Sequence, residues 1–393
     1  MTKILYYVST FPTFSENFIT RELEALLEFQ DLEINILSLQ PGKKGSISDE
    51  LKARTTYFAK SKLARVLDVQ VYLFVLTHPF KILRFIKKYG PRFLSFGTAI
   101  SMLPIVRSFK PDLIHANWIT EGALIANMLS DLTGIPFSIQ CHAVDIWTSS
   151  KENLQQRITD AKFVTTCTAF NKTYISNLIG EALGGKIHTI YHYIDPNIFG
   201  GKKTPFNDVP VLYLIGRKVE KKGYAYFLKA AKILKDRGLQ FTAKIAGDNG
   251  PESEALSKER EDLGLQDIVA FTNEVSFDEH SHNYYESDVY VIPSIKASDG
   301  DLDGIPYTMV EAGFAGLPVV STKVSAIPEL IDDGKNGFLV NEKNEVELAD
   351  KLEVLIRDKE LRKRMGEEVH QKVISMYGYD GTIKKLHELF VIL

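Results

Sequence analysis

The sequence has little cysteine, no large excess of charge of either sign and no long apolar run. Only two of its 393 residues are cysteines, Cys141 and Cys167, and they do not form the spacing of a zinc site or a disulfide framework. The formal net charge is −3, so nothing indicates a protein that covers nucleic acid with a general positive field. No segment offers the roughly 20 uninterrupted apolar residues of a membrane-spanning helix. We therefore expect a protein of a reducing compartment, the cytoplasm, that does not cross a membrane.

The length and the N-terminus indicate how the chain is organised. A chain of 393 residues is expected to split, because single domains hold roughly 100–200 residues. The apolar run at residues 1–8 is short and lacks a small-residue cleavage site, which favours a buried first strand over a secretory signal. We predict one domain over 1–199, a second over 200–380 after a linker at 199–210, and a final helix over 381–393 that returns to the first domain.

Short apolar runs rich in β-branched and aromatic residues alternate with segments of helical periodicity. This alternation predicts an α/β fold with parallel, doubly wound sheets. Two such Rossmann-like domains bind ligands beyond the carboxyl ends of their strands, so we expect them to face each other across a cleft. The expected strands are 3–9, 33–39, 113–116, 136–141, 163–167 and 188–191, then 211–215, 241–246, 269–271, 289–292 and 318–321.

Residues 63–109 depart from this alternation and form a long region of helical pattern. Basic residues, among them Lys81, Arg84 and Lys87, are interleaved there with aromatic residues such as Phe80 and Phe85. That mixture suits a helix lying on anionic lipid headgroups. It equally suits an ordinary amphipathic helix pair that packs on the sheet and exposes a solvated basic face.

A basic loop follows the predicted strand 211–215 and precedes a predicted helix at 224–234. It contains Gly216, Arg217 and Lys222. Backbone amides and the positive end of the helix dipole make such a loop a natural anion site, and the two cations can stabilise a departing diphosphate without a metal. A solvated basic turn is the alternative interpretation.

An acidic loop follows the predicted strand 289–292 and leads into a helix that opens near Tyr307. The amides around a glycine in this loop can donate to phosphate or hydroxyl groups, and a carboxylate one turn into the helix is well placed for both hydroxyls of a ribose. Acidic residues in such loops otherwise cap helices. The expected donor-binding residues are Gly216, Ser294, Gly304, Ile305, Pro306 and Glu311, with Asp303 as a catalytic candidate.

Together these segments resemble family four of the retaining glycosyltransferases, which have the GT-B fold. The most specific part is residues 303–320, where Asp303 and Glu311 are two acids separated by seven residues, followed by a Gly-x-Pro-Val-Val strand. The resemblance implies that Arg217 and Lys222 bind the donor diphosphate and that Glu311 binds the ribose. The family usually has glutamate as the first acid. The shorter Asp303 implies either a changed contact with the transferred sugar or a different sugar.

Two segments of the first half also resemble family elements. His142 and Asp145 match a His-Ala-x-Asp element at the acceptor side, which implies that His142 bonds the donor sugar or orients the acceptor. Asp145 would hold that imidazole or cap the next helix. Ser15, Glu16 and Phe18 resemble the Ser-Glu-x-Phe-Ile element of the bacterial exopolysaccharide branch, which includes colanic-acid-type enzymes. We expect Ser15, Glu16 and Asp145 on the acceptor side, with Ser15 as an N-cap.

The resemblance implies a retaining transferase that needs no cofactor or metal. Its donor would be a nucleoside diphosphate sugar, UDP-linked more often than GDP-linked, and its acceptor a saccharide or a lipid-linked saccharide. Asp301 and Asp303 also form an Asp-x-Asp pattern, which in another nucleotide-sugar fold holds a divalent ion that bridges the diphosphate. Here Arg217 and Lys222 can already neutralise the negative charge of the diphosphate. A GT-B nucleotide-sugar epimerase and a noncatalytic sugar- or nucleotide-binding protein remain alternatives.

Overall fold

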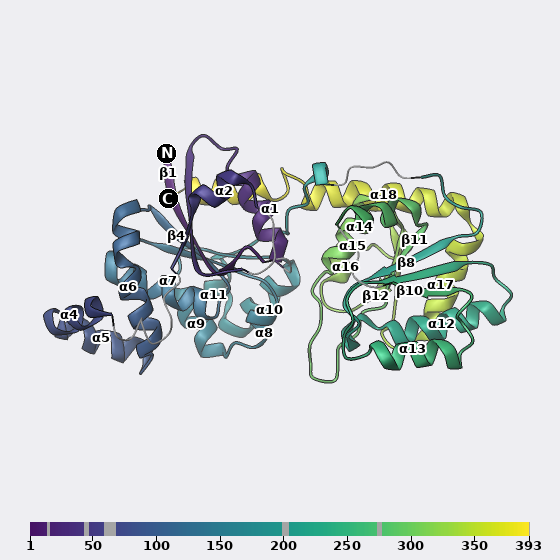
Figure 1. Ribbon diagram of the computed structural model, residues 1–393, viewed down its shortest axis with the longest axis horizontal. Coiled ribbons are helices and arrows are strands. Elements are labelled where there is room, and N and C mark those ends of the chain that lie inside the picture. Colours follow the sequence, from purple (N-terminus) through teal and green to yellow (C-terminus); the bar gives the residue numbers. More distant parts are fainter. Residues whose placement is uncertain (14–15, 43–46, 59–67, 199–203, 273–276, 393) are drawn as a thin grey trace. The chain divides into compact units, whose positions relative to one another are not determined.

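A computed structural model describes residues 1–13, 16–42, 47–58, 68–198, 204–272 and 277–392, and it divides into two compact units (Figure 1). Unit 1 comprises Met1–Tyr193 and Thr382–Leu393, and unit 2 comprises Ile194–Gly381. The division falls upstream of the predicted linker at 199–210, of which residues 199–203 lie outside the described part. The rest of that stretch packs within unit 2, where Asn207 N donates to Asp288 Oδ1 at 2.7 Å.

Unit 1 is built on a seven-stranded parallel sheet in the order β3-β2-β1-β4-β5-β6-β7. In its centre Ile4 on β1 pairs with Ile34 on β2 and with Leu113 on β4. The predicted first strand is confirmed, because residues 4–8 are all buried, as expected for a parallel strand covered on both faces. The strands are β1 (Thr2–Phe11), β2 (Leu32–Pro41), β3 (Thr55–Tyr57), β4 (Leu113–Asn117), β5 (Phe137–Cys141), β6 (Val164–Thr166) and β7 (Ile187–Thr189).

Helices from both ends of the chain cover this sheet. The C-terminal helix belongs to unit 1: His387 stacks on Phe29 with ring centroids 3.8 Å apart, and Phe390 lies 5.0 Å from the His115 ring. The helices are α1 (Asn17–Leu26), α2 (Asp49–Arg54), α4 (Val69–Thr77), α5 (Pro79–Tyr89), α6 (Phe93–Phe109), α7 (Glu121–Thr133), α8 (Val144–Trp147), α9 (Lys151–Asp160), α10 (Ala169–Ile179), α11 (Glu181–Gly184) and α19 (Ile383–Val391).

The described part of the 63–109 region forms three helices, α4, α5 and α6. The break between the first two lies at His78, because Pro79 begins α5 and cannot continue the hydrogen bonding of α4. Within the described residues no single helix is both long and apolar enough to span a membrane. The α4 and α5 pair passes that test together, but the pair bends by 103°.

Unit 2 is built on a six-stranded parallel sheet in the order β10-β9-β8-β11-β12-β13. Since β8 pairs with β11, the loops that follow these two strands leave the same edge of the sheet. The strands are β8 (Val211–Ile215), β9 (Thr242–Ala246), β10 (Val269–Phe271), β11 (Val289–Ile292), β12 (Val319–Thr322) and β13 (Gly337–Val340). The helices are α12 (Tyr224–Asp236), α13 (Ser253–Asp262), α14 (Phe277–Glu286), α15 (Tyr307–Phe314), α16 (Ile327–Leu330), α17 (Glu345–Arg357) and α18 (Lys359–Tyr377).

Candidate active site

The basic loop of unit 2 is held tightly against the loop that follows β11. Gly223 has φ 68°, and a Cβ atom there would lie 1.9 Å from the carbonyl oxygen of Pro293. Gly216 has φ 149°, and its carbonyl accepts a 3.1 Å hydrogen bond from Tyr224 Oη. Only glycine combines such backbone angles with this close approach, so the loop is fixed in position before any ligand arrives.

Two lysines of this loop hold the acidic loop by ion pairs. Lys222 Nζ lies 2.6 Å from Asp303 Oδ2, while Lys221 Nζ lies 3.3 Å from Asp303 Oδ1 and 2.9 Å from Asp301 Oδ2. Burial alone would raise the pKa of Asp303, but the charges of Lys222 and Lys221 outweigh it and hold that pKa below the usual value. Asp303 is therefore a carboxylate at neutral pH, and both acids of the Asp-x-Asp pattern already have cationic partners.

The other two cations of the loop differ in exposure. Arg217 is exposed and lines a hollow of 590 Å³ in unit 2, whose lining also includes Glu220, Asn249 and Asp299. Lys218 is buried, and its Nζ donates to the Gly247 carbonyl at 2.7 Å. Arg217 is thus the cation of this loop that is open to an incoming anion, whereas Lys218 supports the loop from within.

The predicted ribose ligand lies on α15. Glu311 is buried, and its Oε2 accepts a 3.1 Å hydrogen bond from Tyr284 Oη. Just before α15, Gly304 and Ile305 are partly exposed and Pro306 is buried, and Pro306, the N-cap of this helix, makes no side-chain cap hydrogen bond. The amides of the first turn can therefore donate to a ligand.

Ser294 is fully buried beside these loops. Its Oγ has no hydrogen-bond partner within the described ranges, and its carbonyl accepts from Thr322 Oγ1 at 2.5 Å. Buried hydroxyl groups without a partner are uncommon in proteins. The Ser294 hydroxyl is therefore a candidate to hydrogen-bond a ligand beside the acidic loop.

His142 lies at the carboxyl end of β5 inside a wall of rings in unit 1. Its ring centroid is 5.0 Å from Phe18, 4.5 Å from Trp118 and 5.1 Å from His192. Burial lowers the pKa of His142 well below the usual value, and the neighbouring His192 lowers it further. The imidazole is therefore neutral. Its buried Nδ1 has no hydrogen-bond partner among the described residues, so it can still bond a ligand.

Asp145 does not hold that imidazole. Its Oδ1 accepts the backbone N–H groups of His142 and Ala143 at 3.0 Å, and its Oδ2 accepts that of Ile119 at 2.9 Å. Asp145 is not the N-cap of α8 either, because Ala143 has that position and α8 has no side-chain cap. Its carboxylate instead ties the turn that carries His142 to the turn after β4. Its binding of an acceptor remains a prediction.

Ser15 lies outside the described residues, and the N-cap of α1 is Glu16 rather than Ser15. Burial raises the pKa of Glu16. Trp118 has φ 71°, which is uncommon for a residue with a Cβ atom. This turn brings the Trp118 ring to 4.5 Å from the His142 ring.

Trp118, His192 and Lys221 are additional residues of these sites that the sequence did not single out. Trp118 lies two residues after the predicted strand 113–116, and His192 directly follows the predicted strand 188–191. A position just after a strand is the signal that could have found them. Burial lowers the pKa of His192 to about 4, so this ring is neutral too. His142, Cys167 and His192 have potential ligand atoms within 4.8 Å of one another, and this is the cluster in the described chain that could hold a metal ion.

A closed polar ring lies next to this wall. Tyr6 Oη donates to Gln140 Oε1 at 2.8 Å, Gln140 Nε2 donates to Glu22 Oε2 at 2.9 Å, and Glu22 Oε1 bonds Tyr6 Oη. All three residues are buried, and Gln140 is two residues before His142. Burial raises the pKa of Glu22 to about 7, and its hydrogen bonds to Tyr6 and Gln140 offset part of the rise.

Comparison with known proteins agrees with this arrangement. Residues 200–372 match the family Glycosyl transferases group 1. The chain is 26% identical over 379 residues to the putative colanic acid biosynthesis glycosyltransferase WcaL of Escherichia coli K12, covering 89% of each chain. It is 35% identical over 165 residues to the amylovoran biosynthesis glycosyltransferase AmsK of Erwinia amylovora, covering 42% of this chain and 40% of AmsK.

Solved structures show the same architecture. A glycosyltransferase from Rickettsia africae matches with a TM-score of 0.75 at 17% identity, covering 99% of this chain and 97% of that one. Anabaena HepE in complex with UDP matches with a TM-score of 0.74 at 18% identity over 100% of both chains. These matches confirm the predicted fold class, since the chain shares the GT-B architecture of the solved structures. Residues 200–372, most of unit 2, form a domain of the group 1 glycosyltransferases, in agreement with the resemblance.

Proposed function

We propose that the chain transfers a sugar from a nucleoside diphosphate sugar, UDP-linked in preference to GDP-linked, to a saccharide or lipid-linked saccharide during exopolysaccharide synthesis. The observation that carries this proposal is the cationic loop at the carboxyl edge of the unit 2 sheet, with Lys222 ion-paired to Asp303 and Arg217 open to an anion. The names of WcaL and AmsK support the pathway. The complexes of HepE with UDP and UDP-glucose support the donor class.

Unit 2 supplies the leaving-group chemistry in this proposal. Arg217 and Lys222 bind the diphosphate and stabilise the charge that develops on it as the bond to the sugar breaks. When Lys222 shifts toward the diphosphate, Asp303 keeps Lys221 as its partner and can accept hydroxyls of the transferred sugar. Glu311 accepts the ribose hydroxyls, and the uncapped amides around Gly304, Ile305 and Pro306 add donors.

The reaction retains the anomeric configuration and needs no enzyme nucleophile. The acceptor hydroxyl forms its bond to the anomeric carbon on the face from which the nucleoside diphosphate departs, and the departing phosphate takes the hydroxyl proton. Because Lys221 and Lys222 already neutralise Asp301 and Asp303, no metal is required at that pair. Unit 1 serves the acceptor: neutral His142 hydrogen-bonds sugar hydroxyls, Ser15 and Glu16 contact the acceptor, and Asp145 positions His142.

We place this activity in the cytoplasm, at the inner face of the membrane, where a lipid-linked acceptor presents its saccharide. A nucleotide-sugar epimerase would cleave or convert the donor without an acceptor, and a binding protein would hold the donor without turnover. Product analysis separates these three functions.

The first test is a screen of nucleotide sugars for thermal stabilisation. A ligand at 100 times its Kd stabilises by about 2.7 kcal/mol, which shifts the melting temperature by roughly 5 °C or more. The stabilising donor is then tested for transfer with EDTA and with Mg²⁺. Failure of every nucleotide sugar to raise the melting temperature would contradict the proposal.

The second test compares two lysine variants. Lys222→Ala should lower kcat by about 10²–10³, the usual loss when one transition-state donor is removed. Lys232→Ala is the matched control, since Lys232 also pairs with an aspartate, Asp236, but on the exposed surface of α12. Turnover by Lys222→Ala at the rate of the control would show that the loop does not carry the reaction.

A further inference from the structure

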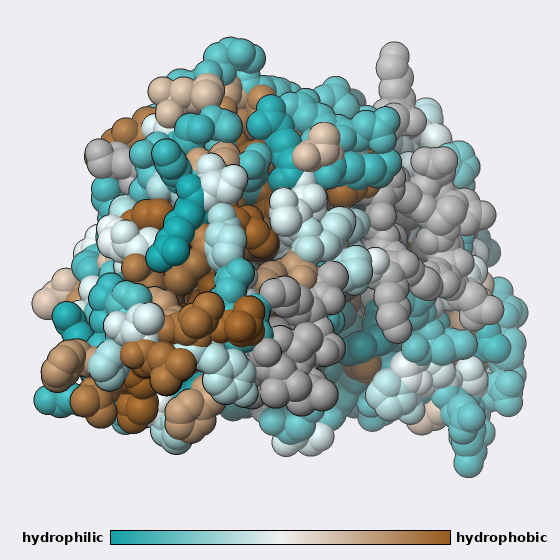
Figure 2. Space-filling model, turned by 60° about the vertical axis from the view of Figure 1, so that its left-hand side comes forward, coloured by the Kyte–Doolittle hydropathy of each residue, from teal (hydrophilic) through white to brown (hydrophobic). Residues whose placement is uncertain are grey.

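The outer face of α4 and α5 exposes large apolar side chains that no described element covers. Leu76 is 77% exposed, Phe80 84% and Leu83 65%. Figure 2 shows hydrophobic side chains gathered at the lower left, on the side where α4 and α5 lie in Figure 1. We call this surface the α4–α5 face; its exposed apolar residues are Val69, Tyr72, Leu73, Val75, Leu76, Phe80, Leu83, Ile86 and Phe93.

The same surface carries several cations. Residues 69–111 contain no aspartate or glutamate. Of their basic residues, Lys81, Arg84, Lys87 and Arg92 lie at or near this surface, whereas Lys88 is ion-paired to the rest of unit 1 and Arg107 and Lys110 lie at the end of α6. Lys81, Arg84 and Lys87 are exposed and repeat every third residue, as do Phe80, Leu83 and Ile86. Cations and apolar groups therefore lie side by side on one exposed helix.

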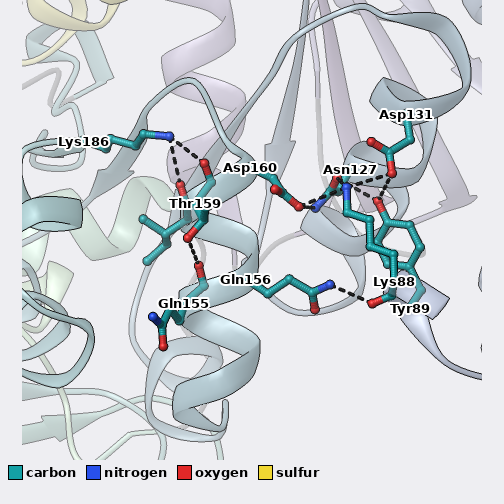
Figure 3. A network of polar contacts seen from close by, with 10 residues as sticks. Lys88, Tyr89, Asn127, Asp131, Gln155, Gln156, Thr159, Asp160 and Lys186 are labelled. Carbon is teal, nitrogen blue, oxygen red and sulfur yellow. Dashed lines mark hydrogen bonds and ion pairs between the residues drawn. The ribbon is translucent and has the colours of Figure 1, made fainter. Parts of the chain in front are cut away.

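The α4–α5 face is fixed to the body of unit 1. Tyr89 Oη lies 2.8 Å from both Asn127 Oδ1 and Asp131 Oδ2, and Lys88 Nζ lies 2.8 Å from Asp131 Oδ2 and 3.1 Å from Asp160 Oδ2 (Figure 3). Gln156 Nε2 also donates to the Lys88 carbonyl at 2.9 Å. Lys88 and Tyr89 thus anchor α5 to α7 and α9, while the outward side chains remain free.

At the other end, Asp68 joins α4 to α6. Its Oδ1 accepts from the backbone of Gln70 at 3.0 Å, and its Oδ2 accepts from Ser101 Oγ at 2.7 Å. Phe85 packs against Phe96 with ring centroids 4.0 Å apart. Both helices are therefore held as a platform, so their outward apolar groups cannot turn inward without breaking these contacts.

A hollow of 360 Å³ opens between α4, α5 and the start of α6. Its lining is apolar, with Val71, Val75, Ile82 and Phe96 among its residues, and Arg92 is the charged residue of that lining. Such a site can hold a hydrocarbon chain but offers few partners to a polar ligand.

We propose that the α4–α5 face docks on an anionic lipid bilayer and that the hollow takes one hydrocarbon chain of a lipid, with Arg92 beside its phosphate. This inference deepens the proposed function and rests on it, because a lipid-linked acceptor presents its saccharide at such a surface. Amphipathic helices with large apolar groups and a basic face lie in the bilayer interface. Each exposed cation strengthens binding to anionic lipid by about fivefold, so charge and apolar burial act together.

Vesicle flotation tests the docking. The protein should float with vesicles of phosphatidylcholine and phosphatidylglycerol, bind vesicles of phosphatidylcholine alone much less, and lose affinity as salt is added. The variant K81E/R84E/K87E should bind at least about 100-fold more weakly. L76S/F80S should also bind more weakly, and because both side chains are exposed, neither variant should lower the melting temperature.

Matched controls lie in unit 2. Val346→Ser removes an exposed apolar side chain that is 52% exposed on α17, and Lys258→Glu reverses an exposed charge on α13. Both should bind vesicles like the unchanged protein. Equal binding by the α4–α5 variants and these controls would overturn the proposal. A second outcome would also overturn it: the unchanged protein self-associates in buffer and does not bind vesicles, and L76S/F80S abolishes the self-association. A second copy of the chain would then cover the α4–α5 face.

The hollow has its own test. Tyr72 lines it, so the variant Tyr72→Trp places a fluorescent reporter there. Vesicles with brominated acyl chains should quench this added fluorescence, and the absence of quenching in bound protein would refute the hollow as a chain site. Transfer to a water-soluble saccharide should be unchanged in K81E/R84E/K87E. If the unchanged protein transfers sugar to the water-soluble saccharide but does not bind vesicles, this inference fails and the proposed function stands. If it binds vesicles but transfers no sugar, the proposed function fails.

Discussion

Glu22 is a buried acid whose replacement should stabilise unit 1 at neutral and alkaline pH. In the ring formed with Tyr6 and Gln140, a protonated Glu22 lets every member donate one hydrogen bond and accept one. A glutamine at position 22 can make the same set, since its amide donates where the carboxyl proton would. An ionised Glu22 can only accept, and it carries a buried charge. We therefore predict that Glu22→Gln raises the free energy of unfolding of unit 1.

The magnitude follows from the pKa of Glu22, which burial raises from 4.5 to about 7. Because the folded-state pKa lies above the unfolded one, the folded state binds more protons between these values, and its stability falls as pH rises through this window. One pKa unit corresponds to 1.36 kcal/mol, so the ionised carboxylate costs about 3 kcal/mol above pH 8. The difference in free energy of unfolding between Glu22→Gln and the parent should therefore grow by about 2–3 kcal/mol as the pH rises from 5 to 8.

Tryptophan fluorescence during urea unfolding measures this effect. Both tryptophans, Trp118 and Trp147, lie in unit 1, so the signal reports that unit separately from unit 2. Glu28→Gln, on the exposed surface just after α1, is the control and should leave the pH dependence of the parent unchanged. The reasoning is refuted if the stability difference between Glu22→Gln and the parent is the same at pH 5 and pH 8.

Three further predictions concern the site. Arg217→Ala should lower kcat/KM for the donor by about 10²–10³ in steady-state assays without changing the melting temperature, because Arg217 is exposed; a normal rate would remove it from the donor site. His142 should contribute no inflection to the pH–rate profile between pH 6 and 8, because burial and His192 keep its pKa well below that window; an inflection lost in His142→Asn would contradict this. Gly223→Ala should destabilise unit 2 by at least about 2 kcal/mol in urea unfolding, because its Cβ atom would clash with the Pro293 carbonyl. Gly238→Ala is the control: it has φ 74° but no atom within 4 Å of its Cβ position, so it should cost about 1 kcal/mol. Equal losses would show that Pro293 moves to relieve the clash.

Much of the fold could be predicted because buried parallel strands appear in the sequence as continuous apolar runs. The strands β8, β10 and β11 have the predicted bounds, and α15 begins at the predicted Tyr307. Two strands were missed. The edge strand β3 lacks that signal, because its sequence is Thr-Thr-Tyr and it has little burial. The strand β13 carries the signal in Phe-Leu-Val and is buried, but it begins with glycine, which favours a turn.

Features of the site that are contiguous in the sequence could be predicted. Features formed by packing between distant segments could not. The strand, loop and helix around Arg217 and Lys222 are contiguous, so their charges could be placed at one sheet edge. The sequence could not show which of these cations is buried, because Lys218, Lys221 and Lys222 are the same residue type and differ only in their surroundings in the fold. In the same way, Trp118 and His192 come from distant segments that only the sheet order brings beside His142.

The distribution of charge over the two units supports the assignment of the donor to unit 2. Among the aromatic side chains around His142 in unit 1, burial keeps His142 and His192 uncharged at neutral pH. Their imidazole rings therefore offer hydrogen bonds and apolar faces but no positive charge. In unit 2 the loop after β8 contains Arg217, Lys218, Lys221 and Lys222 within six residues, and Asp301 and Asp303 compensate part of this charge. Under the proposed function, a diphosphate would be attracted to this loop and would replace Asp303 as the partner of Lys222, whereas the uncharged rings of unit 1 would suit uncharged saccharide hydroxyls. In that proposal, charge alone directs the donor to unit 2 and the saccharide to unit 1.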